Sequence, residues 1–404
     1  MVSFLTKLIK NYFTSYVGLS FLCWQGILLN GIESTLIGIY YFLPLYFVKN
    51  LHLSVMLAGM LISFYGMGTI MGGFLGGKLS DKFTPGLISI YSLFLQAINF
   101  FILTHLTLPF LLMINLFSMG IASYSFITSN SLWVLSQCQS DENKRLQAIT
   151  LLNAASNLGL SISAIIIGLL NYKFKFIFSF SVVLLILLGV YSILIDKFST
   201  ENSFSTLSET KEVLSDNYKR KLIWVLFTCL FLVGLIIFQT NTTYSFYIQD
   251  TFKVLGLKSL SILFTLNCLL VVFIQTPIAN LFRNINKILI AGIGAFLLGF
   301  GMFMLIFSSS FILAIIATIV YTVGEILFFS VAQLICYQSV PLNKKGQMMG
   351  MYRMIYACSR VVAPAAGGFI YQQLGGRVLW IICGCIGLFC LGVCNYCKKY
   401  VASV

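Results

Sequence analysis

Four charged residues stand out because each lies inside an otherwise apolar stretch. Glu325 interrupts the run "VYTVGEILFFS", and Glu33 lies in a comparable run near the start of the chain. Arg353 and Arg360 are seven residues apart, so on a helix they share one face, with Tyr356 between them. A buried carboxyl group can take up and release a proton, and a guanidinium can bind a carboxylate through two parallel hydrogen bonds. These residues are the first candidates for chemistry.

The stretches that hold these charges are predicted to cross a membrane. The chain has 404 residues, of which 59% are hydrophobic and 9% charged, and its mean hydropathy is +0.96. Soluble domains carry roughly 25% charged residues. The composition indicates an integral membrane protein, in which a charge at the bilayer centre costs roughly 2.5 to 3.5 kcal/mol on insertion scales. Anionic lipid headgroups account for the net charge of +14, so no nucleic-acid partner is expected.

The hydropathy pattern predicts twelve spans, because about 20 apolar residues cross the hydrocarbon layer. They cover approximately residues 19–48, 55–78, 86–105, 109–138, 146–170, 176–196, 222–249, 259–282, 288–307, 311–340, 346–373 and 376–397. Lys and Arg residues gather at both termini and in alternate loops, which favours both termini in the cytoplasm. We therefore expect a multi-pass protein of the cytoplasmic (inner) membrane.

A polar segment in the middle of the chain divides six spans from six. Rich in Ser, Thr, Glu and Lys, it predicts a cytoplasmic linker at 197–221 between an N-terminal six-helix bundle (1–196) and a C-terminal one (222–404). Shifting the chain by 200 residues places the segment 144–168 over 344–368, with identities that include Gln147 with Gln347. The two bundles are therefore predicted to be pseudo-symmetric repeats.

Three of the charged residues are predicted to lie in one layer of the membrane. At ~1.5 Å per residue, Glu33 lies ~21 Å up the first helix, Glu325 ~22 Å up the tenth and Arg360 ~22 Å up the eleventh. Two interpretations follow. Either a carboxylate pairs permanently with Arg360, since an unpaired buried charge is unfavourable, or a carboxyl group exchanges that partner for a proton as the site opens and closes.

Two motifs resemble those of a known family. The segment "GGFLGGKLSDKF" is similar to the signature loop between the second and third helices of the major facilitator superfamily, with Gly77, Leu79, Asp81 and Lys82 in register. Thr84 and Pro85 replace the later Gly and basic residues of that signature. The segment 342–369, "LNKKGQMMGMYR…APAAGGF", resembles the eleventh helix of the family. The resemblance implies an all-α major facilitator fold of twelve helices, in which Gly77, Asp81 and Lys82 form a gate.

The resemblance also implies that the first, fourth, seventh and tenth helices line a central cavity. Their polar and aromatic residues, together with those of the eleventh helix, are candidates for contact with a solute: Asn30, Tyr40, Tyr124, Thr128, Gln239, Asn241, Tyr244, Tyr321, Arg353, Tyr356 and Arg360. The alternative for each is a hydrogen bond to a neighbouring helix, which is common for hydroxyls and amides in membranes.

These features predict a secondary active transporter that works by alternating access. We expect coupling to protons through Glu325 or Glu33, and the arginines favour an anionic or zwitterionic metabolite. Efflux of drugs, amphipathic compounds or lipids by proton antiport is the alternative, although "LLMINLFSMG" lacks the basic residue of drug antiporters. A non-transporting sensor on the same fold is a further, weaker alternative.

The sequence lacks the constellations that an enzyme would need. We find no nucleophile with a base, no phosphate-binding loop and no metal-ligand spacing among the 11 cysteines and 2 histidines. No cofactor and no metal are therefore expected. The expected partners are a small-molecule solute, protons and membrane lipids, and the protein is expected to be a monomer.

Overall fold

The protein is helical throughout the part that its structure describes. The computed structural model describes residues 19–138, 142–171, 173–196, 217–281, 286–308, 310–338 and 345–401, and every regular element in these ranges is a helix. The first half of the chain forms α2 (Phe21–Ile37), η1 (Gly38–Phe42), α3 (Leu43–Lys49), α4 (Val55–Lys82), α5 (Pro85–Leu103), α6 (Pro109–Ser136), α7 (Glu142–Leu170) and α8 (Phe174–Asp196). The second half forms α9 (Asn217–Ile237), η2 (Phe238–Asn241), α10 (Thr243–Thr251), α11 (Leu257–Leu281), α12 (Lys287–Met304), η3 (Leu305–Phe307), α13 (Phe311–Gln338), α14 (Lys345–Leu374) and α15 (Gly376–Val401).

Eleven helices in the described residues are long and apolar enough to cross a membrane, counting α2, η1 and α3 as one. They match eleven of the twelve predicted spans. The remaining prediction, 346–373, corresponds to α14, which has 30 residues but is not among the apolar candidates. Arg353 and Arg360 lower its hydropathy, and α14 is packed between α4, α9 and α15.

The two halves of the chain repeat one another. Helices α4, α5 and α6 begin at Val55, Pro85 and Pro109, and α11, α12 and α13 each begin 202 residues later. The first and seventh spans even break at equivalent places, since the short 3₁₀ segments η1 and η2 begin at Gly38 and Phe238. The predicted pseudo-symmetry is therefore present in the helix boundaries.

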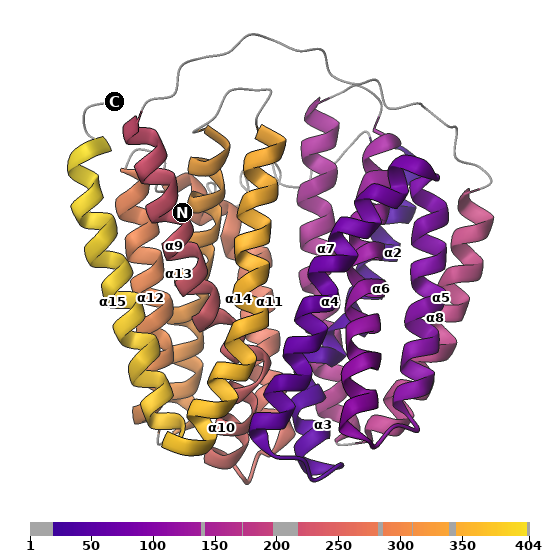
Figure 1. Ribbon diagram of the computed structural model, residues 1–404, viewed down its shortest axis with the longest axis horizontal. Coiled ribbons are helices and arrows are strands. Elements are labelled where there is room, and N and C mark those ends of the chain that lie inside the picture. Colours follow the sequence, from indigo (N-terminus) through magenta and orange to yellow (C-terminus); the bar gives the residue numbers. More distant parts are fainter. Residues whose placement is uncertain are drawn as a thin grey trace, which may run out of the picture.

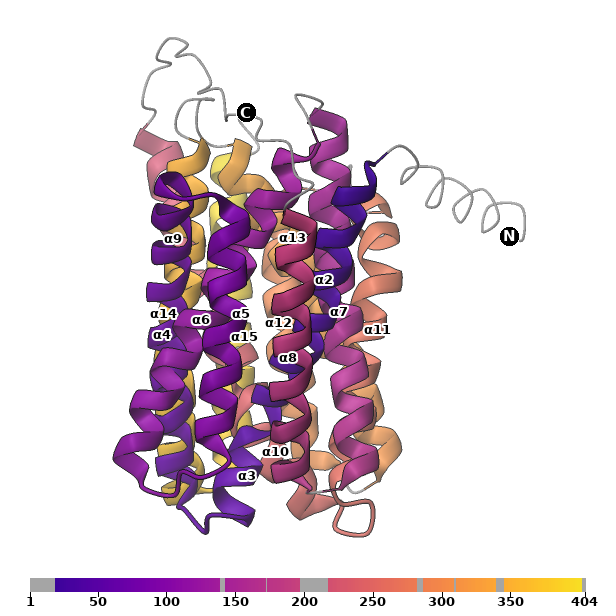
Figure 2. The same ribbon diagram turned by 90° about the vertical axis from the view of Figure 1, so that its right-hand side faces the viewer.

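The long helices lie roughly along one common axis, so the molecule has two ends (Figures 1 and 2). We call the end where α2 begins and α15 ends the terminal end. The opposite end, where α3 and α10 lie, is the hairpin end, because its connections are short. Gly375 alone joins α14 to α15, and its φ of 83° lies in the left-handed region that glycine adopts without strain.

Glycines allow the helices within each half to pack closely. Gly68, Gly72 and Gly76 recur every four residues on α4 and face α6. A Cβ atom added to Gly76 would lie 2.8 Å from the Cα atom of Ser125, and one added to Gly68 would lie 3.0 Å from the Cα atom of Gly120. Such approaches admit only small residues, as is common between membrane helices. This packing fixes α6 and α4 as one unit.

The two halves meet at the hairpin end. Helix α4 contacts α14 there, and the backbone N–H of Met56 donates a 2.9 Å hydrogen bond to Oε1 of Gln372. A Cβ atom on Gly66 would lie 3.0 Å from the carbonyl oxygen of Arg360, whereas Gly73, seven residues closer to the terminal end, has no described neighbour within 4 Å. Figure 1 shows α4 and α14 converging toward the hairpin end and diverging toward the terminal end. The structure is therefore closed at its hairpin end.

Replacing Gly59 with tryptophan is expected to force the halves apart at the hairpin end, because Gly59 packs directly on the backbone carbonyl of Pro364. The measurement is the yield of cross-linking between Met56→Cys and Gln372→Cys in a chain without other cysteines, which should fall several-fold. Gly392→Trp is the matched control, because no described atom lies within 4 Å of a Cβ at that position. An unchanged yield in Gly59→Trp would contradict this account.

Candidate functional site

A polar cavity lies between the two halves, about 90 Å³ in volume. Its polar lining consists of Asn157, Thr240, Asn241, Asn267 and Glu325. Its aromatic lining consists of Tyr41, Phe238, Phe264, Tyr321 and Tyr356. A site of about 10–15 Å³ holds one water molecule, so this cavity has room for a small organic group.

The elements around the cavity come from both halves of the chain. Tyr41 lies on η1 and Asn157 on α7, whereas η2, α11, α13 and α14 provide the other lining residues named above. The 3₁₀ segment η2 provides three of the lining residues, Phe238, Thr240 and Asn241. The breaks in the first and seventh spans therefore present polar and aromatic side chains at the interface between the halves.

Glu325 is held by one of its two carboxyl oxygens. The Nδ2 atom of Asn267 donates a 3.0 Å hydrogen bond to Oε2 of Glu325 and a 2.9 Å hydrogen bond to the Thr322 hydroxyl. Within the part of the chain that the structure describes, Oε1 has no hydrogen-bond partner. The carboxyl group is thus oriented by α11 and still has one oxygen for a proton or a ligand.

Arg360 makes its contacts with aromatic residues. Its Nη1 donates a hydrogen bond to the Tyr124 hydroxyl. Its guanidinium carbon lies 4.6 Å from the ring centroid of Tyr124 and 4.9 Å from that of Phe238. Because Tyr124 lies on α6 and Phe238 on η2, the guanidinium joins the two halves by cation–π stacking. Its Nε is buried and, among the described residues, has no hydrogen-bond partner.

Glu33 lies apart from the cavity. It is fully buried on α2, and its Oε1 accepts a 3.0 Å hydrogen bond from Nε2 of Gln96 on α5. Its Oε2 and the Oε1 of Gln96 lack partners among the described residues. Both carboxylates thus accept from amides, and in this part of the chain neither forms the permanent ion pair with Arg360 that the sequence left open.

Tyr41 connects the two charged groups at the centre of the molecule. Its side chain interacts electrostatically with both Arg360 and Glu325, and its ring packs edge-on against Phe264 at 5.0 Å between centroids. Glu325 reaches the cavity from α13, whereas Arg360 on α14 stacks on Phe238 and does not line the cavity.

Several predicted contact residues instead hold helices together. Asn30 donates to the Leu152 carbonyl at 3.0 Å and to Ser156, which ties α2 to α7. Gln239 donates to the Ala363 carbonyl at 2.9 Å, which ties η2 to α14. Neither residue lines the cavity. Both form a hydrogen bond to a neighbouring helix, which was the alternative to contact with a solute.

Two predicted tyrosines are also inside the bundles. Tyr40 approaches the Ser123 hydroxyl at 3.3 Å and packs on Tyr65, with 4.4 Å between ring centroids. Tyr244 approaches the Thr318 hydroxyl at 3.3 Å in the second half. The predicted residues that do line the cavity are Glu325, Asn241, Tyr321 and Tyr356.

The remaining predicted residues lie nearer the terminal end. Gly77 and Lys82 are in the last turns of α4, Gly77 faces the Thr128 methyl group, and Lys82 is exposed. The side chain of Asp81 is outside the described part of the chain. Arg353 is exposed on α14, one heptad from Arg360 toward the terminal end.

Asn157, Asn267 and Tyr41 line the cavity but were not among the sequence candidates. Asn157 and Asn267 lie on the fifth and eighth spans, which the family resemblance did not assign to the cavity. An isolated Asn in the apolar run "ILFTLNCLLVVF" is a signal that could have identified Asn267. No comparable signal separates Tyr41 from Tyr40, because the 3₁₀ turn of η1 decides which tyrosine faces the cavity.

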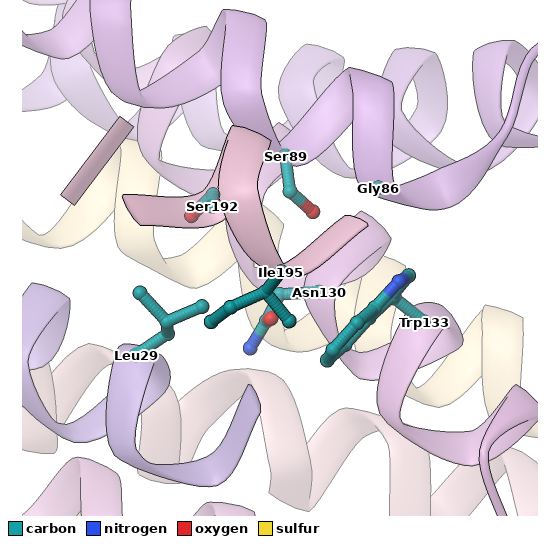
Figure 3. Close-up of a pocket in the computed structure, with 7 residues that line it drawn as sticks. All are labelled: Leu29, Gly86, Ser89, Asn130, Trp133, Ser192 and Ile195. Carbon is teal, nitrogen blue, oxygen red and sulfur yellow. The ribbon is translucent and has the colours of Figure 1, made fainter. Parts of the chain in front are cut away.

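A second, much smaller cavity lies inside the first half of the molecule. Its volume is about 10 Å³, which is the size of one water molecule. Figure 3 shows the residues around it: Leu29, Gly86, Ser89, Asn130, Trp133, Ser192 and Ile195. It is too small to be a solute site. No group of three or more metal-ligating side chains occurs among the described residues.

Two pseudo-symmetric sets of membrane helices with a polar cavity between them define a membrane transporter. The chain belongs to the Major Facilitator Superfamily, whose sequence profile matches residues 23–364. It is therefore a secondary transporter and not an enzyme, as the sequence predicts.

Known proteins of this family are similar along most of the chain. YqjV of Bacillus subtilis (strain 168), named an uncharacterized MFS-type transporter, is 24% identical over 363 residues, which are 87% of this chain and 87% of that protein. The structure of the nucleoside transporter NupG has a TM-score of 0.76 at 16% identity and covers 94% of this chain and 100% of that one. The POT family transporter PepTSo has a TM-score of 0.75 at 15% identity and covers 95% and 98%. These structural likenesses confirm the predicted major facilitator fold.

Removing the Tyr124 ring is expected to destabilise the contact between the halves more than removing its hydroxyl. Tyr124→Leu loses a cation–π contact worth about 0.5–2 kcal/mol as well as a hydrogen bond, whereas Tyr124→Phe retains the ring. The midpoint of thermal unfolding of the purified protein in detergent should fall in the order wild type, Tyr124→Phe, Tyr124→Leu. Equal midpoints for the two variants would show that the stacking is unimportant.

Proposed function

We propose that this transporter couples the movement of a small organic solute to protons, with Glu325 as the coupling residue. The observation that carries the proposal is that Glu325 lines the cavity with one oxygen held by Asn267 and the other available. Glu33 has a different place, because it is fully buried against Gln96 outside the cavity. Of the two carboxyl groups that the sequence offered as coupling candidates, the proposal therefore assigns the coupling to Glu325.

The proposed cycle follows from the position of Glu325. Inside a closed cavity the neutral carboxyl is favoured, because burial disfavours the charged form. When the cavity opens to water at one end, the carboxylate is hydrated and the proton can leave. Alternating exposure to the two sides thus moves a proton together with, or in exchange for, the solute.

Arg360 and Glu325 support the choice of an anionic or, preferably, zwitterionic metabolite. Glu325 lines the cavity, and Arg360 stacks on Phe238, which also lines it, so a solute there would have a carboxylate beside it and a guanidinium behind one ring. A zwitterion can place its cationic end against Glu325 and its anionic end toward Arg360, which a purely anionic solute cannot.

The proposal includes the position of the protein in the cell. The distribution of Lys and Arg favours the cytoplasmic membrane with both termini inside, so the terminal end would face the cytoplasm. The structure would then be the inward-facing state, closed on the outside by α4 and α14. We retain the division into 1–196, a linker at 197–221 and 222–404, with residues 197–216 outside the described part. Gly77, Asp81 and Lys82 would then lie at the cytoplasmic gate.

One observation favours a second candidate function. Five aromatic side chains line the cavity, which would also suit amphipathic compounds exported by proton antiport. Counterflow in proteoliposomes, with candidate metabolites and candidate amphipathic compounds offered separately, distinguishes the two classes.

Glu325→Gln is expected to abolish accumulation driven by a pH gradient, because the neutral amide cannot exchange a proton, while counterflow persists at saturating solute concentrations even though the amide binds the solute more weakly. The assay compares both activities in proteoliposomes, with the amount of inserted protein measured for each variant. Glu33→Gln is the matched control, and it should retain accumulation. If both variants accumulate solute like the wild type, proton coupling through these carboxylates is wrong.

A further inference from the structure

From the cavity lining we infer that the transporter binds an organic ammonium group between Glu325 and a set of aromatic rings. The inference rests on the proposed function, since it names the solute class of the same cavity. It also narrows that class: the solute is an amine or a zwitterion bound through its cationic end, and not a simple anion.

Any charge that the cavity lining carries is negative, because the one charged residue type in its described part is a carboxyl group. Among the described residues that line it, Glu325 alone is charged. Arg360 does not line it, because its guanidinium is stacked on Tyr124 and Phe238 behind the wall. An anion entering the cavity would meet the carboxylate before it could reach the arginine. The prediction of an anionic solute rested on the arginines, and Arg360 is poorly placed to bind an anion in the cavity.

The walls around Glu325 are aromatic. Tyr41 packs edge-on against Phe264, with 5.0 Å between ring centroids, and Phe238 packs against Tyr356 at 4.9 Å. Tyr321 completes the lining one helical turn before Glu325. The faces of aromatic rings attract cations, and aromatic cages around a carboxylate are suited to ammonium groups.

The titratable side chains around Glu325 are phenols and a thiol, so Glu325 is the group among them that changes its charge near physiological pH. Tyr321 on α13, Cys268 on α11, Tyr41 on η1 and Tyr356 on α14 interact with it electrostatically. Phenol and thiol groups are ordinarily neutral at physiological pH. Helix α12 packs against α13 through the glycine Gly294 and presents no charge there. An ammonium group would therefore compete with a proton for the same carboxylate.

Polar groups beside the carboxylate can orient the rest of the solute. Asn267 fixes Oε2 of Glu325, and Oε1 has no hydrogen bond to any other described residue. The Oδ1 atom of Asn241 accepts a 3.1 Å hydrogen bond from the Thr240 hydroxyl, so this bond does not occupy the amide nitrogen of Asn241. Asn157 lines the opposite side on α7. A solute with hydrogen-bonding groups near its amine would use these amides.

The test is binding of three probes of similar size and different charge to the purified full-length protein. Benzylammonium, benzyl alcohol and benzoate are titrated by calorimetry in detergent at neutral and at mildly acidic pH, where the amine keeps its charge. Benzylammonium should bind at least tenfold more tightly than either other probe, and its affinity should fall as the solution becomes acidic.

Variants assign the binding to the cavity. Glu325→Gln should weaken benzylammonium binding at least tenfold and remove its pH dependence. Phe264→Leu should weaken it about 2- to 30-fold, the range expected for one cation–π contact. Glu33→Gln, the same substitution outside the cavity, should bind like the wild type.

Tighter binding of benzoate than of benzylammonium would overturn the inference, as would unchanged benzylammonium binding in Glu325→Gln. These results are independent of the vesicle assay. Amine binding without pH-driven accumulation of any solute would support the ammonium site and reject proton coupling. Accumulation of an anion without amine binding would support proton coupling and reject the ammonium site.

Discussion

The feature on which the rest of the structure depends is a carboxyl group in the cavity with no opposite charge beside it. In a membrane interior such a group needs a proton, a cation or a bound solute, because a bare charge there is strongly unfavourable. Glu325 has an amide on one oxygen and aromatic rings around it, and the nearest guanidinium is occupied with Tyr124 and Phe238. Its state is therefore set by what enters the cavity, which is what a transporter requires.

The surrounding fold keeps this group accessible and accurately placed. Glycines bring α4 and α6 into backbone contact in the first half, and Gly294 and Gly324 do the same for α12 and α13 in the second. This tight packing holds the helices of each half together. The cavity lies between the halves, where η1 and η2 interrupt two of the spans.

Much of this arrangement could be predicted from the sequence. Hydropathy located the spans, and a shift of 200 residues revealed the repeat, because both depend on patterns along one helix. The predicted spans include 346–373, which is α14, although its arginines reduce its hydropathy. Glu325 was identifiable because a charge inside a membrane-spanning segment is unfavourable and usually has a functional role.

Contacts between helices were harder to predict. Asn30 and Gln239 are as polar as Asn241 and Asn267, yet the first two bind neighbouring helices and the last two line the cavity. The difference is a rotation about each helix axis, which one sequence does not specify. The partners of Arg360 were missed for the same reason, since two aromatic rings from distant segments can replace the carboxylate that its charge suggested.

The contact between Gly66 and the Arg360 backbone has a mechanical consequence. Arg360 lies near the middle of α14, with roughly 22 Å of helix toward one end and roughly 21 Å toward the other at 1.5 Å per residue. The helix can thus tilt about Arg360, which lies beside the cavity and has nearly equal lengths of helix on either side. A tilt of about 10° would move both ends by about 4 Å in opposite directions. Opening one entrance would then close the other by a similar distance, while Arg360 and its guanidinium hardly move.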